Sequence, residues 1–179
     1  MPKYVAFLRA INVGGHTVKM DELRGLFEAL GFSKVETFIA SGNVIFDSSS
    51  RNTKSLEKKV EAHLQDSLGY EVATFIRSIA ELQAVARYMP FSEAELKVET
   101  NSLYVAFLAG EPGDKATQKL MSFMTEFDDF HVSGREAYWL CRTMLRESAF
   151  SMARLEKTLG MKATFRNSTT LKKLAAKYS

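Results

Sequence analysis

The pentapeptide Tyr-Val-Ala-Phe-Leu occurs twice in the chain, at 4–8 and at 104–108. Both copies are apolar at nearly every position, whereas a strand with one face in water alternates apolar and polar residues. An apolar run that is too short for a capped helix predicts a strand covered on both faces. We therefore expect each copy to form a central strand of a β-sheet.

A similar order of helices and strands is predicted after each copy. Apolar residues at helical spacing predict helices, alternating residues predict half-exposed strands, and Leu-Gly steps mark helix ends. In the first half, the pattern predicts a helix over 20–30, strands over 34–40 and 44–46, a helix over 56–68, a strand over 71–77 and a helix over 79–89 capped by Ser78. In the second half, it predicts a strand over 102–109, a helix capped by Asp114, strands over 130–132 and 137–141, a helix over 152–159, a strand over 163–165 and a last helix capped by Ser168.

These elements predict an α+β protein of two tandem ferredoxin-like βαββαβ repeats, each with a four-stranded antiparallel sheet and a trailing helix. The first and third strands of each repeat would be central. We expect a first subdomain over 1–90, an acidic connector over 91–101 and a second subdomain over 102–179. Because two helices cover only one face of such a sheet, the trailing helices or the other repeat's sheet must cover the second face. We expect the two repeats to pack together around a shared core.

Composition restricts the classes of protein to which the chain can belong. With 179 residues, 46% of them hydrophobic, the chain can bury a sizeable core. Its single cysteine, Cys141, excludes an internal disulfide and a multi-cysteine metal site. His16, His63 and His131 have no neighbours at metal-ligand spacing, so we expect no metal site. The sequence indicates neither a signal peptide nor a membrane span, and we expect a cytoplasmic protein.

The segment that follows the first apolar strand is the first candidate binding site. It contains Arg9, Asn12, Gly14 and Gly15 and leads to the N-terminus of a helix, where free backbone N–H groups and the helix dipole favour an anion. Arg9 must find a carboxylate, backbone carbonyls or a ligand, because it follows an otherwise apolar strand. A buried structural ion pair is the commoner outcome for such an arginine. Paired glycines commonly do no more than permit a turn.

Two further pairs of residues belong to the candidate site. Ser41 and Asn43 lie in the turn between the second and third predicted strands. Arg166 and Asn167 lie at the end of the last predicted strand, where a guanidinium, an amide and the Ser168 hydroxyl come together at a helix N-terminus. The alternative for this second pair is structural: Ser168 would cap the helix, and Arg166 would be a solvated residue of an edge strand.

No group of residues predicts a catalytic site. Asp128 and Asp129 are adjacent, so on a strand they point to opposite faces and could not act as a carboxylate pair. Cys141 lies in an apolar segment and is expected to be an inert core thiol. The sequence therefore indicates no particular reaction and no cofactor.

Positive charge is concentrated toward the C-terminus. The net charge is only +3, but residues 142–179 contain nine Lys/Arg and two Glu. A surface of that sign attracts phosphates or carboxylates, although solvated lysines on two amphipathic helices are the simpler interpretation. A βαββαβ sheet is also the scaffold of RNA-recognition domains, whose basic and glycine-containing signature is missing here. We expect the aromatic residues of the central strands to be core residues.

Three segments of the first half form a specific pattern: Phe7-Leu8-Arg9-Ala10-Ile11-Asn12-Val13-Gly14-Gly15, then Met20-x-x-Leu23-Arg24, then Val35-x-Thr37-x-Ile39-x-Ser41-Gly42-Asn43-Val44-x-Phe46. Together with Pro90-Phe91 and Thr164-Phe165-Arg166-Asn167, this pattern resembles the bacterial domain-of-unknown-function family 1697. The resemblance extends over essentially the whole chain and implies a two-subdomain α+β protein, but it implies no reaction. The chain departs from the family pattern at Ala10, where glycine is usual, and at Ser168, where tryptophan is usual. A ligand held by that tryptophan would be bound differently here or not at all.

We therefore expect a protein that binds a small molecule through its phosphate or carboxylate group. Three alternatives remain: a nucleic-acid-binding module that uses the basic C-terminal third, an enzyme of a class that the sequence does not reveal, and an interaction scaffold. The sequence does not determine the oligomeric state.

Overall fold

The computed structural model describes residues 1–9, 11, 17–38, 42–142 and 150–178. The chain divides into two compact units, one formed by Met1–Ala84 with the C-terminal Tyr178, and one formed by Val85–Lys177. The division falls within a helix that follows the fourth strand, and the subdomain limits expected from the sequence, 1–90 and 102–179, stay a prediction.

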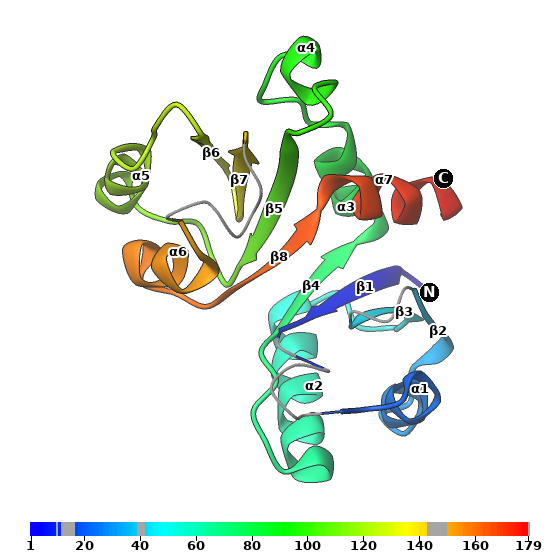
Figure 1. Cartoon of the computed structure of the whole chain (residues 1–179). Helices are drawn as coiled ribbons and strands as arrows, with labels where there is room; N and C mark the ends of the chain where they lie inside the picture. The colour runs from blue at the N-terminus through cyan, green and yellow to red at the C-terminus, as the bar shows by residue number, and fades with distance from the viewer. Residues whose placement is uncertain (10, 12–16, 39–41, 143–149, 179) are drawn as a thin grey trace. The chain divides into compact units, whose positions relative to one another are not determined.

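The first unit contains one four-stranded antiparallel sheet in the order β2-β3-β1-β4 (Figure 1). Its elements are β1 (Lys3–Leu8), α1 (Met20–Glu28), β2 (Ser33–Thr37), β3 (Asn43–Asp47), α2 (Thr53–Leu68), β4 (Thr74–Ser78) and the first part of α3 (Ile79–Arg87). The first and third strands are central, as the apolar pattern predicted.

The second unit has the same strand order, β6-β7-β5-β8, and all its pairs are antiparallel. Its elements after α3 are α4 (Glu93–Leu96), β5 (Ser102–Leu108), α5 (Asp114–Met121), β6 (Asp128–Ser133), β7 (Glu136–Cys141), α6 (Met152–Leu159), β8 (Ala163–Asn167) and α7 (Ser168–Lys177). The predicted fold class, two tandem βαββαβ units in an α+β arrangement, is confirmed. The short helix α4 within the expected connector was not predicted.

One face of each sheet packs against the two helices of its unit. In the first unit, Phe27 of α1 contacts Phe46 of β3, and the Phe46 ring stacks on Phe32 with centroids 4.4 Å apart. In the second unit, Trp139 of β7 lies in the core, and its Nε1 donates a hydrogen bond to Asp128 Oδ1 at 2.8 Å. Burial of these side chains removes apolar surface from water, which is the main stabilising contribution to each unit.

The opposite face of each sheet is buried as well. Val5 and Phe7 of β1, and Val105 and Phe107 of β5, are at most 1% exposed. Strands β5 and β8 of the second sheet contact α7, the predicted trailing helix. The shared core expected for the two repeats stays a prediction.

The aromatic residues of the central strands are core residues, as expected. The exposed fraction is at most 4% for Tyr4, Phe7, Phe46, Tyr138 and Trp139, and Phe107 is fully buried, whereas Tyr104 is half-buried. Aromatic rings that bind RNA bases on such a sheet must be open to solvent. These five rings are therefore not available for base stacking.

Helix ends follow the predicted signals with two differences. Ser78 and Glu81 form a reciprocal capping box, in which each side-chain oxygen accepts the other residue's backbone N–H at 3.0–3.1 Å. Asp114 is the first helical residue after Gly113 and does not act as a cap. Ser168 likewise begins α7 rather than capping it. The cap is Asn167, because its side-chain oxygen accepts the N–H of Thr169 at 2.9 Å.

Candidate functional site

The first predicted binding segment is described only in part. Asn12, Gly14, Gly15 and Ser41 lie outside the described residues. Arg9 directly follows β1, is half-buried, and donates its backbone N–H to Ala73 O at 2.9 Å, while its Nε atom is buried. A ligand-binding role for these residues stays a prediction.

Asn43 contributes to the turn between β2 and β3. It is fully buried, its Nδ2 donates to Phe38 O at 2.9 Å, and its own carbonyl accepts the Phe38 N–H at 3.0 Å. The neighbouring Gly42 has φ +78°, and its carbonyl accepts the N–H of Leu8. These bonds fix the turn against the end of β1, which gives Asn43 a structural role whether or not it binds a ligand.

Arg166 differs from the solvated edge residue that the structural alternative described. It is only 8% exposed, and its Nη1 donates to Thr164 Oγ1 and to Phe165 O, both at 2.9 Å. Burial lowers the pKa of Arg166 to about 10.

The first unit has an arginine at the matching place. Arg77 pairs with Val5 as Arg166 pairs with Val105, and its Nη1 donates to the carbonyl of the preceding residue, Ile76, at 3.1 Å. The letters Ala-Thr-Phe occur at 73–75 and at 163–165, but strand register aligns Thr74 with Ala163, so the repeated letters are one residue out of register. Because both sheets have an arginine at this position, we infer that the main role of Arg166 is structural.

Asn167 lines a polar hollow in the second unit. This feature, which we term the α7 hollow, has a volume of about 140 Å³. Cavities of this size hold several water molecules. Eight residues line it: Leu96, Asn101, Ser102, Leu103, Asn167, Ser168, Thr169 and Lys172.

Strand pairing explains how residues distant in sequence meet at the α7 hollow. Tyr104 of β5 lies opposite Asn167, the last residue of β8. Because β5 begins at Ser102, its first residues extend past the end of β8 and reach the first turn of α7. The hollow is thus formed where one strand ends and its neighbour continues.

The charge of the α7 hollow is suited to an anion. Of the eight lining residues, Lys172 is the only charged one, and none is acidic. The first turn of α7 also presents backbone N–H groups and the positive end of the helix dipole. Hydroxyl and amide side chains line the remaining polar wall, so the hollow combines hydrogen-bond donors with a positive charge.

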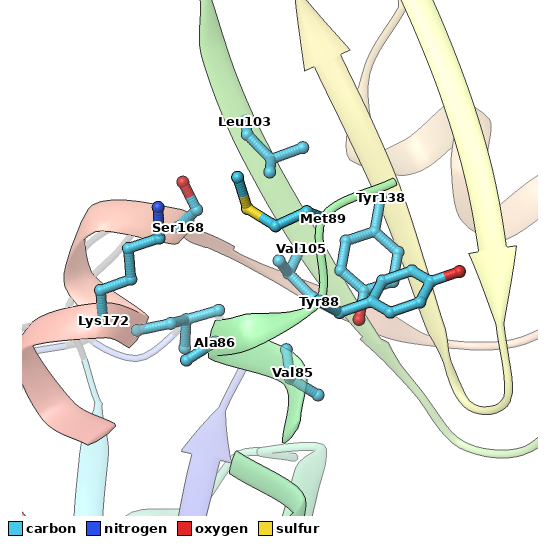
Figure 2. A pocket seen from close by; sticks show the side chains of 10 residues that line it. Val85, Ala86, Tyr88, Met89, Leu103, Val105, Tyr138, Ser168 and Lys172 are labelled. Carbon is cyan, nitrogen blue, oxygen red and sulfur yellow. The ribbon is translucent and has the colours of Figure 1, made fainter. Parts of the chain in front are cut away.

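An apolar slot adjoins the α7 hollow and shares Leu103, Ser168 and Lys172 with it (Figure 2). Its volume is only about 10 Å³, which is room for about one water molecule. Apolar side chains supply most of its wall: Val85, Ala86, Tyr88, Met89, Leu103, Val105, Tyr138 and Leu171.

Two tyrosines form one side of the slot. The rings of Tyr88 and Tyr138 lie with centroids 5.1 Å apart, and the Tyr88 hydroxyl is 2.6 Å from His131 Nε2, within hydrogen-bond distance. Burial raises the pKa of the Tyr138 hydroxyl, and the nearby Glu136 and Tyr88 raise it further. Tyr138 therefore stays neutral at physiological pH.

The other residues considered from the sequence have structural roles. Asp128 accepts the hydrogen bond from Trp139, whereas Asp129 forms an ion pair with Arg142 at 3.3 Å, so the two carboxylates do not face each other. Cys141, the single cysteine of the sequence, is buried. Among the described residues, no cluster of His, Cys, Asp and Glu could hold a metal, and no helix is long and apolar enough to cross a membrane.

Sequence reasoning found Asn167 and Ser168 but missed the rest of the α7 hollow. Lys172 carried a usable signal, because it lies four residues after Ser168 and residues at that spacing share a helix face. Asn101 and Ser102 carried none. Their place beside α7 depends on the register between β5 and β8.

Comparison with known proteins gives a family and a solved structure to which the chain is similar. The model of a family described as "Protein of unknown function (DUF1697)" matches residues 1–138. Among solved structures, the chain is similar to that of the conserved bacterial protein SP0830 from Streptococcus pneumoniae, with 21% sequence identity and a TM-score of 0.76. That match covers 99% of this chain and 98% of the other, and at this identity it shows the fold alone. No curated protein matches the chain.

Proposed function

We propose that this chain, which belongs to the DUF1697 family, binds a small molecule through a phosphate or carboxylate group at the α7 hollow. The family description names no activity, so the proposal is argued from the hollow itself. The anion would lie at the first turn of α7, between Lys172 and the side chains of Asn167, Ser168 and Thr169.

The proposal depends on one observation, the charge of the lining. A lysine is the sole charged residue among the eight that line the hollow, and it lies on the helix whose positive end opens there. An anion would gain from both without meeting a carboxylate. A neutral polar ligand would gain only the hydrogen bonds.

Substitution of Lys172 tests the proposal. Inorganic phosphate and acetate would be titrated at low ionic strength, where screening is weak, and backbone amide resonances followed by NMR. We expect the resonances of Asn167, Ser168 and Thr169 to move. Lys172→Met should weaken binding by about five-fold, the loss expected for one charge-assisted hydrogen bond that is partly exposed to water.

Lys173→Met is the matched control. Lys173 is exposed on the same helix but does not line the hollow. Its substitution by methionine removes the same charge as Lys172→Met. Equal weakening by both variants would mean that only overall charge matters, and this would refute the site. Absence of any anion-dependent shift at the start of α7 would refute it as well.

A further inference from the structure

We propose that the molecule bound at the α7 hollow is an amphiphilic acid, with its anionic group in the hollow and a short aliphatic group in the adjoining apolar slot. This inference rests on the proposed function and adds the chemical class of the ligand. It follows from the fact that the two cavities share a wall formed by Leu103, Ser168 and Lys172.

The shared wall provides a continuous path from a polar to an apolar environment. In Figure 2 the side chain of Lys172 runs along α7 with its amino group beside Ser168. The methylene groups of a lysine are apolar and commonly line apolar surface while the charge stays in water. An anion at Lys172 would therefore have its substituent next to the slot and away from the polar side.

The walls of the slot differ in rigidity. Tyr88 is held by its contact with His131 at 2.6 Å and by the ring of Tyr138. Met89 is 48% exposed, and a methionine side chain has three rotatable bonds that let it adapt to a guest. A slot of about 10 Å³ accepts little without such movement, so a flexible wall on one side allows it to widen.

Exposed apolar side chains at the slot would also contribute to the free energy of binding. Tyr88 and Met89 are 38% and 48% exposed, and a ligand that covers them removes apolar surface from water. Covering such surface favours an aliphatic substituent over a polar one. Lys172 restricts the partner to an acid, because an uncharged aliphatic molecule would leave the hollow unused.

A homologous series of linear carboxylates from acetate to hexanoate tests this inference on the full chain. Each added methylene that enters the slot should tighten binding by about four-fold until the slot is filled. Hexanol, which has the same chain without the charge, should bind more weakly than hexanoate. Dissociation constants would be obtained from the amide resonances that shift at the start of α7.

Met89→Ser identifies the slot as the cause of any gain. We expect this variant to lower the affinity for hexanoate toward that for acetate and to leave the affinity for acetate unchanged. Met124→Ser is the control, because Met124 is 43% exposed but lines neither the hollow nor the slot.

The outcomes separate the two proposals. If acetate and phosphate bind at the α7 hollow but affinity stays flat along the series, or falls equally in both methionine variants, the amphiphilic ligand is refuted and anion binding stands. If hexanol binds as well as hexanoate, the amphiphilic acid is refuted too, and if acetate and phosphate do not bind there, the proposed function is refuted.

Discussion

Gly42 is a residue whose identity the backbone and its neighbours both require. Its φ of +78° lies in the left-handed region, and an added Cβ would lie 2.5 Å from Ile11 Cγ2 and 3.2 Å from Leu8 Cβ. Gly134 has a similar φ of +57°, but a Cβ there would meet nothing within 4 Å. Substitution of Gly134 would therefore cause backbone strain alone, whereas substitution of Gly42 would cause backbone strain and steric overlap.

We expect Gly42→Ala to destabilise the protein more than Gly134→Ala. The left-handed conformation alone costs about 1–2 kcal/mol for a residue with a Cβ, and the overlap with Ile11 adds to this at Gly42 only. Urea unfolding measures both free energies. Equal losses would show that the chain relaxes around Gly42 at no cost.

The buried hydroxyl of Tyr138 should make stability depend on alkaline pH. Its pKa is raised in the folded protein by burial first, whereas an unfolded tyrosine ionises near its usual value of about 10. The group thus contributes stability that is fully present below about pH 10. This stability is lost as pH rises toward the folded pKa, at up to about 1.4 kcal/mol per pH unit.

Tyr138→Phe provides the measurement. The free energy of unfolding should fall less in this variant than in the unsubstituted protein between about pH 8 and about pH 11. The comparison with the variant is needed because the lowered pKa of Arg166 has the opposite effect on the free energy of unfolding. Arg166 binds its proton more tightly in the unfolded chain than in the folded protein, so its contribution to stability rises with pH above about 10. Parallel pH profiles would contradict a raised tyrosine pKa.

At the scale of elements, the outer edge of β4 is covered by carboxylates. The backbone N–H groups of Thr74, Ile76 and Ser78 point away from β1. They donate to Glu61 at 3.1 Å, to Glu57 at 2.8 Å and to Glu81 at 3.0 Å, respectively. Open N–H groups on an edge strand invite pairing with another chain, so these glutamates protect the edge.

The backbone N–H groups at the edge of β6 are bonded by side chains that are close in sequence. The N–H of Asp128 donates to Thr125 Oγ1 at 3.0 Å, and the N–H of Phe130 donates to Asp129 Oδ1 at 2.9 Å. These side chains lie within three residues of the groups that they satisfy. An incoming strand would have to displace both bonds.

Glu57→Ala should be costly, because Glu57 is 6% exposed and also lies 4.0 Å from the buried Arg77. We expect a loss of about 2 kcal/mol, the usual penalty for leaving a buried donor without its acceptor. Glu93→Ala removes a carboxylate from the exposed ion pair with Lys97 and should cost less than about 1 kcal/mol. Thermal or urea unfolding compares them, and similar losses would show that the β4 edge does not need its carboxylate.

At the scale of the whole molecule, the distribution of charge and aromatic rings leads us to expect only weak binding of RNA. The basic C-terminal third supplies positive charge, but the ring of Tyr138 on the second sheet is 3% exposed. Charge without stacking gives weak, non-specific binding that counterions reverse.

We expect single-stranded RNA to bind no more tightly than about 10⁻⁶ M and to dissociate as salt is raised to physiological strength. Fluorescence anisotropy with a labelled oligonucleotide measures this directly. Tight binding that persists in salt would contradict the proposal for a small anionic ligand and restore the nucleic-acid alternative.

The apolar pattern by itself predicted which strands are central in each sheet. The pentapeptides at 4–8 and 104–108 identified the central strands, because continuous apolar runs occur only where both faces are covered. The Leu-Gly steps at Gly69 and Gly160 predicted helix ends, and both glycines have positive φ there. These features are local, so neighbouring residues in the chain were enough to read them.

Only the tertiary structure decided where distant residues meet. The equivalence of Arg77 with Arg166 comes from strand register, because the Ala-Thr-Phe letters that both strands contain are one residue out of register. Lys172 and Asn101 line one hollow because β5 extends past β8. Register and packing are set by the core as a whole, which is why the candidate site appeared in the structure and not in the sequence.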